Sequence, residues 1–228
     1  SDLKRFEKIK NDKTIIEVYN KISEYEDLDK GWAHHNLDHV KNVAKLVESL
    51  LSELGYDDSF IEEAKIAALL HDTGAIEGKN NHSLRSYEFA KKYFEKNNII
   101  LKNKDLVLEA IKIHSDGFNS DNIIALALIL SDKLDIKYTR VAKEGYKVKG
   151  MKELQYITNI FIEINNKNIE IKFICHEKIN KNELEGFYFM EKVFKAIMAF
   201  SKKMNLNPRV LFNNEEWEKF HMIQLLYE

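Results

Sequence analysis

Apolar residues recur along most of the chain at intervals of three and four positions, which places them on one face of an α-helix. Val43, Val47 and Leu50 show this spacing, and later segments repeat it. Proline and glycine are the residues that most often interrupt a helix. The 228 residues contain only one proline and eight glycines, so we expect few interruptions. We expect helices near residues 2–25, 37–54, 58–72, 83–97, 104–115, 121–135, 183–204 and 214–226.

One segment alternates instead with a period of two, which is typical of a β-strand. Isoleucines and other apolar or β-branched residues occupy every second position in residues 156–164 and again in residues 169–175. The intervening Asn165-Asn166-Lys167-Asn168 is typical of a turn. We therefore predict a β-hairpin that faces solvent and decorates a helical body. The helix that follows suits packing on this body or on a second subunit, which leaves a homodimer open.

The composition is that of a globular protein, with 44% hydrophobic and 32% charged residues. The length suits one domain, or one domain with an appended subdomain. Lysine and arginine number 35 against 37 aspartates and glutamates, for a formal net charge of -2. Because no broad basic excess exists to attract a phosphate backbone, we expect no general nucleic-acid binding.

The single cysteine, Cys175, excludes an internal disulfide and a cysteine-rich zinc site. A reducing, cytoplasmic setting is the expectation that follows. No apolar stretch approaches the length needed to cross a bilayer, and the first residues do not read as a signal peptide. We expect no membrane association.

Several histidines and aspartates occur where apolar residues are expected. His39 stands one helical turn before Val43, so it faces the same interior as the apolar stripe. His71 and Asp72 end the next stripe, and Asp132 ends a strongly apolar one. An unpaired buried carboxylate costs several kcal/mol in practice, so something cationic should meet it.

Each of these residues alone has an ordinary explanation. A lone histidine on an apolar face is usually a hydrogen-bonded core residue, and Asp132 alone could cap its helix or pair with Lys133. Five such residues, His114 included, on the inner faces or ends of separate helices favour a shared ion. A metal would neutralise the carboxylates and use imidazole nitrogens as ligands.

These residues, in this order, resemble the HD-domain metal-dependent phosphohydrolase superfamily, which is named for an adjacent His-Asp pair. The resemblance lies in His39 of His-Val-Lys-Asn-Val, in His71 and Asp72 of Leu-Leu-His-Asp-Thr-Gly, and in Asp132 of Ser-Asp-Lys-Leu-Asp.

The resemblance implies a mostly α fold, an HD-domain helical bundle with a small β-hairpin and C-terminal helices. It implies an HD-type metal-binding domain over residues 1–150, with its core at residues 32–135. Residues 151–228 would form the hairpin and C-terminal helices, packed on the same body.

The resemblance also implies a ligand set. The first metal would be bound by His39, His71, Asp72 and Asp132. His82 and His114 stand where members with two metals carry further histidines, and Asp72 would then bridge both ions. The alternative for His82 is an exposed residue in the first turn of a helix. Mixed nitrogen and oxygen donors suit one or two divalent ions of Mn, Fe, Zn, Co, Ni or Mg.

Two further residues are candidates for catalysis. The segment from His35 to His39 resembles the Tyr-His-Asn-x-x-His element of cyclic-nucleotide phosphodiesterases, although His34 replaces the tyrosine. This implies that His35 protonates the leaving oxygen; the alternative is a polar loop residue. Lys133 adjoins a predicted ligand and is our candidate for contacting the phosphate.

The motif reads His-Asp-Thr-Gly-Ala and no Gly-Tyr-Pro follows, which argues against the branch that degrades cyclic di-GMP. The resemblance therefore implies a phosphohydrolase, either a phosphomonoesterase or a phosphodiesterase. Its substrate would be a small phosphate ester, foremost a nucleotide, attacked by a metal-bound hydroxide. Two alternatives stay open: a di-iron oxygenase with the HD fold, and a non-catalytic HD module that binds a nucleotide.

Overall fold

A computed structural model describes residues 4–227 of the chain. Internal contacts divide these residues into two compact units. The first, here the helical unit, comprises residues 4–29 and 35–132; the second, here the sheet unit, comprises residues 30–34 and 133–227. The domain boundary at residue 150 stays a proposal.

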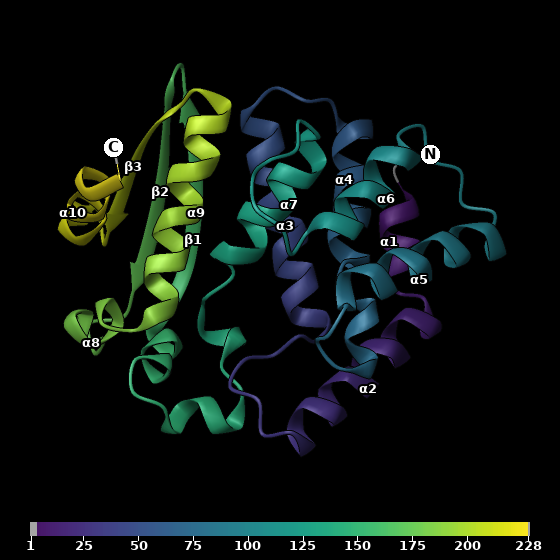
Figure 1. The fold of residues 1–228 in the computed structure, drawn as a ribbon, viewed down its shortest axis with the longest axis horizontal. Coiled ribbons are helices and arrows are strands. Elements are labelled where there is room, and N and C mark those ends of the chain that lie inside the picture. The colour runs from purple at the N-terminus through teal and green to yellow at the C-terminus, as the bar shows by residue number, and fades with distance from the viewer. Residues whose placement is uncertain (1–3, 228) are drawn as a thin grey trace. The chain divides into compact units, whose positions relative to one another are not determined.

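The helical unit confirms the mostly helical fold that the apolar spacing predicts (Figure 1). Its elements are α1 (Arg5–Lys10), α2 (Lys13–Leu28), α3 (Leu37–Glu53), α4 (Asp58–Leu70), the 3-10 helix η2 (Thr73–Glu77), α5 (His82–Lys96), α6 (Lys104–Ile113) and most of α7 (Ile123–Leu134).

Two of the predicted helices are divided in the structure. The one expected over residues 2–25 breaks before α2, because Asp12 is extended and its side chain accepts a hydrogen bond from Thr14 N at 3.0 Å. An aspartate in this position caps a new helix. The one expected over residues 183–204 is likewise divided near Gly186, between α8 (Lys181–Glu185) and α9 (Tyr188–Met204).

Helices α3 and α4 pack against each other and form the centre of the helical unit. Val43 and Val47 of α3 are fully buried, as are Ala64 and Ala68 of α4. The small alanine side chains let the two helix backbones approach closely. This packing brings the start of α3 toward the end of α4. The buried residues there are polar: His39 in α3, and His71 and Asp72 after α4.

The sheet unit contains a four-stranded sheet with the order β1-β2-β3-β4. Strands β1 and β2 are antiparallel, β2 and β3 are parallel, and β3 and β4 are antiparallel. Its elements are the 3-10 helices η3 (Tyr138–Arg140), η4 (Lys143–Lys147) and η5 (Met151–Tyr156), strands β1 (Ile157–Asn165) and β2 (Asn168–Cys175), helices α8 and α9, strands β3 (Asn207–Phe212) and β4 (Glu215–Glu216), and α10 (Glu218–Tyr227).

The predicted hairpin is confirmed as β1 and β2, with Asn166 in the left-handed conformation at the turn. The prediction that it faces solvent as a decoration was wrong, since Ile169, Ile171 and Phe173 are fully buried. These residues are buried by contacts with parts of the chain that are distant in sequence. Helix α9 lies against the sheet and carries the chain to β3, which pairs in parallel with β2 (Figure 1).

Within residues 4–227, no helix combines the length and the apolar character that crossing a bilayer requires.

Cys175 lies at the end of β2 and is buried, and its reactivity tests that burial. Burial raises the pKa of its thiol to about 12. Because the thiolate is the reacting form, we expect iodoacetamide at about pH 8 to label the native protein at least about 100-fold more slowly than the urea-unfolded chain. Labelling followed by mass spectrometry measures both rates, and equal rates would contradict the burial of this residue.

Candidate metal centre

His39 is placed by the start of α3. The side chain of Asn36 caps this helix by accepting a hydrogen bond from His39 N at 2.9 Å. The residue as a whole is 1% exposed. Its Nε2 lies 3.0 Å from Oδ1 of Asp132 and 3.4 Å from Oδ2 of Asp72. The first turn of α3 therefore directs one nitrogen toward two carboxylates.

His71 follows the last residue of α4 as its C-cap, and its backbone N donates to Ala68 O at 3.5 Å. Its Nδ1 donates to the carbonyl oxygen of Ala68 at 2.5 Å, which leaves Nε2 as the nitrogen with a free lone pair. Nε2 lies 3.4 Å from Oδ2 of Asp72 and 3.5 Å from Oδ1 of Asp132. The helix end thus selects the tautomer that a metal ligand needs.

One cluster of donor atoms results from these placements. Each donor atom lies within 4.8 Å of the others. Two ligands at about 2.1 Å from one ion lie about 3.0 to 3.4 Å apart for octahedral or tetrahedral angles. The carboxylate–imidazole distances match this spacing. The cluster consists of His39, His71, Asp72 and Asp132.

A second cluster adjoins the first and consists of Asp72, His82 and His114. The two histidines again use Nδ1 toward a backbone carbonyl, of Lys79 at 3.0 Å and of Ile111 at 2.7 Å. Their Nε2 atoms lie 3.0 Å from each other, and 3.5 Å and 3.6 Å from Oδ1 of Asp72. Asp72 therefore directs one oxygen to each cluster.

Gly74 explains how α5 comes close enough to supply His82. A Cβ atom at Gly74 would lie 2.4 Å from His82 O and 2.4 Å from Ser86 N, which no side chain tolerates. Gly74 N donates to Ser86 Oγ at 2.9 Å across this contact. The glycine of the His-Asp-Thr-Gly motif thus lets η2 and α5 touch.

Two opposing effects act on the pKa of each buried carboxylate, Asp72 and Asp132. Burial by itself raises the pKa of Asp72, but the attraction of His71 and hydrogen bonding led by His114 lower it well below the usual range. Burial also raises the pKa of Asp132, and hydrogen bonding led by His39 lowers it well below that range. Both groups stay ionised at neutral pH.

Two buried atoms of the first cluster, His71 Nε2 and Asp72 Oδ2, have no hydrogen-bond partner. An unsatisfied buried polar atom costs about 1–3 kcal/mol. A cation satisfies a lone pair of each at once. The donors present therefore fit a divalent metal ion, and their roles as ligands stay a proposal.

His35 lies beside the first cluster, with its ring centre 5.8 Å from that of His39. Both polar groups of His35 that face α2 are held by one carboxylate: its backbone N donates to Glu26 Oε1 at 2.8 Å, and Nδ1 donates to Glu26 Oε2 at 2.5 Å. The Nζ of Lys79 approaches Nε2.

Glu26 is the residue of this site that sequence reasoning missed. Burial by itself raises the pKa of its carboxyl, and the hydrogen bond with His35 is the largest of the effects that lower it below the usual value. A signal for it exists in the sequence: Ile15, Tyr19 and Ile22 form the buried stripe of α2, and Glu26 continues that stripe by one more turn.

Lys133 follows Asp132 in α7 and belongs to the sheet unit. There its Nζ lies 5.6 Å from the ring centre of Phe189. Its predicted contact with a phosphate group stays a prediction.

The comparison with family models identifies the class. Residues 36–137, a little under half of the chain, match the HD domain, so this stretch of the chain resembles an HD domain. The match contains every predicted metal ligand, and His35 precedes it by one residue.

Curated relatives include ribonucleases Y. The chain is 27% identical to ribonuclease Y 1 of Pediococcus pentosaceus over 178 residues, which cover 73% of this chain and 32% of that protein. It is 33% identical to ribonuclease Y of Mycoplasma capricolum over 139 residues, which cover 53% of this chain and 25% of that protein. The chain thus spans a third or less of the length of these relatives.

Proposed function

We propose that the protein is a metal-dependent phosphohydrolase that cleaves a phosphate ester of a nucleotide or a similar small molecule. The observation that carries this proposal is the position of Asp72, whose two oxygens face two adjoining clusters of imidazole and carboxylate donors. The HD domain supports a metal-dependent hydrolase. We propose two ions, one held by each cluster.

Divalent ions in these clusters would lower the pKa of coordinated water and offset the charge of the phosphate. The chain's own contribution is to orient the donors, which the hydrogen bonds from His71, His82 and His114 to backbone carbonyls accomplish. His35, held by Glu26, would deliver a proton to the leaving oxygen.

The names of the relatives and the charge of the chain bear on the substrate class. The relatives are named ribonucleases, which supports a phosphodiester of ribonucleotides. A formal net charge of -2 favours a nucleotide or a short strand over a long one. The single cysteine, buried and free, is in keeping with the cytoplasmic setting that we propose.

Elemental analysis and a substrate panel test this proposal together. We expect the purified protein to contain divalent metal, and to release phosphate or a nucleoside from nucleotides without oxygen. Isolation with iron and oxygen uptake with an organic substrate would instead identify an oxygenase. Tight nucleotide binding without turnover, with each metal supplied in turn, would identify a non-catalytic module.

The role of Glu26 is tested by Glu26→Gln. Loss of the carboxylate removes the negative charge that faces Nδ1 of His35, so we expect kcat to fall about 10- to 100-fold while the metal content stays the same. Because the pKa of Glu26 is lowered, its ionised form and this contribution are present at neutral pH and lost only as the pH falls through that lowered value.

Glu24→Gln is the matched control, since Glu24 is an exposed glutamate of the same helix. Glu26→Asp should recover part of the lost kcat. An effect of Glu26→Gln on stability alone, with kcat unchanged, would show a structural role only.

A further inference from the structure

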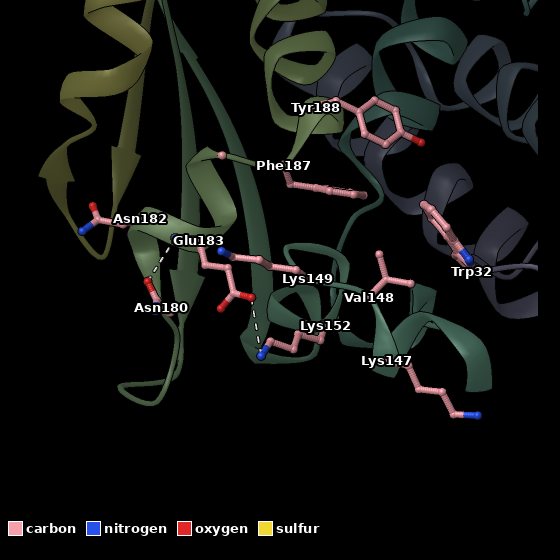
Figure 2. Close-up of a pocket in the computed structure, with 11 residues that line it drawn as sticks. Trp32, Lys147, Val148, Lys149, Lys152, Asn180, Asn182, Glu183, Phe187 and Tyr188 are labelled. Carbon is pink, nitrogen blue, oxygen red and sulfur yellow. Dashed lines mark hydrogen bonds and ion pairs between the residues drawn. The ribbon is translucent and has the colours of Figure 1, made fainter.

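A large open cavity of about 1110 Å³ lies within the sheet unit, and none of its lining residues belongs to the donor clusters (Figure 2). Three stretches of chain form it: residues 30–34, the segment of η4 and η5, and the segment of α8 and α9. Its wall combines aromatic rings with lysines, as Figure 2 shows.

Trp32 is an exposed aromatic residue on a firmly held backbone. Its side chain is 45% exposed. Its carbonyl oxygen accepts from Ala142 N at 2.9 Å, and the neighbouring His34 exchanges hydrogen bonds with Arg140 at 2.8 Å and 2.7 Å. A large exposed aromatic ring on a held backbone offers a platform for a planar ligand.

The charges of the lining favour an anion. The lining contains three lysines and one glutamate, Glu183. Lys152 lies 3.4 Å from Glu183, and Lys147 lies 3.3 Å from Glu144 outside the cavity. Lys149 is exposed, and no ion pair to it is found among residues 4–227. Its ammonium group is available to a ligand.

Gly150 places Lys149 beside the aromatic wall. It has a φ of +86°, and a Cβ atom there would lie 2.6 Å from the Cβ of Phe187. The ring of Phe187 in turn contacts that of Tyr188, with centres 4.8 Å apart. Only glycine allows this close approach, so a cation and a group of aromatic rings share one cavity.

We propose that this cavity binds a nucleotide unit, with its base stacked on Trp32 and its phosphate held by Lys149. Every base has an apolar face, and proteins that bind single strands pair such aromatic platforms with lysines. A concave wall favours this ligand over a bilayer, because insertion into lipid needs aromatic residues that protrude. A free nucleotide and one unit of a single strand offer the same chemistry.

Fluorescence of the whole 228-residue chain tests the proposal. Trp217 is fully buried, so a base stacking on Trp32 should quench the exposed part of the emission. We expect quenching by AMP and by a short oligoadenylate in the presence of EDTA, which removes hydrolysis from the measurement. Saturation at lower concentration by the oligoadenylate identifies a single strand as the source, and equal saturation identifies a free nucleotide.

Variants assign the contacts, with anisotropy of a fluorescein-labelled oligoadenylate as the readout. We expect Trp32→Ala to raise the Kd at least about tenfold. Lys149→Ala should raise it about threefold or more and reduce its dependence on salt. Lys167→Ala removes the same charge from the β1–β2 turn and should change neither.

Three results would overturn the proposal. The first is no response to nucleotides, and the second is an equal loss in Lys149→Ala and Lys167→Ala. The third is a blue shift of Trp32 with phosphatidylserine vesicles alone. Hydrolysis measured separately with metal present tells this failure apart from a failure of the proposed activity.

Discussion

Exchanging Asp72 for asparagine is expected to remove bound metal from both clusters and to lower hydrolysis by at least about 1000-fold. Asparagine keeps the shape of the side chain but lacks the negative charge that two cations would share. Asp72 lies against His39 and His71 through one oxygen and against His82 and His114 through the other. Elemental analysis and phosphate release measure the two effects.

Two further variants sharpen this test. His114→Ala removes a donor from the second cluster only, so we expect it to lose one of two ions and to retain the first. Asp105→Asn changes an exposed aspartate in the first turn of α6 and should keep both metal and activity. An Asp72→Asn protein with unchanged metal content and rate would refute the proposed metal centre.

Truncation of Trp217 to alanine is expected to lower the free energy of unfolding by about 3–5 kcal/mol. The side chain is fully buried, with ring centres 5.4 Å from Phe173, 5.0 Å from Phe194 and 4.9 Å from Phe212. Its Nε1 also donates to Glu185 Oε2 at 2.5 Å. Alanine would leave a cavity and an unpaired carboxylate.

Urea unfolding followed by circular dichroism measures this loss. Trp217→Phe should cost less, because it retains a ring. Trp32→Ala is the matched control: the same truncation at a 45% exposed site should cost about 1 kcal/mol or less. Equal losses at the two tryptophans would contradict the packing described for the sheet unit.

The sequence by itself determined the elements that rest on local spacing. The stripes of α3 and α4 follow the helical period, and the hairpin of β1 and β2 follows the strand period and the turn at Asn166. Polar residues on apolar stripes, such as His39 and Asp132, were also visible, because burial must be compensated wherever it occurs. These features depend on residues within a few positions of one another.

Tertiary structure decided what depends on residues distant in the chain. Strand β3 joins β2 only because α9 carries the chain across the sheet, and this pairing buries a face that was expected to meet solvent. Glu26 holds His35 across nine positions, and residues 30–34 supply Trp32 to a cavity built mainly by residues 147–188. The two oxygens of Asp72 face separate clusters, and this arrangement requires α3, α5, α6 and α7 to meet. The spacing of apolar residues within a single helix does not predict such a meeting.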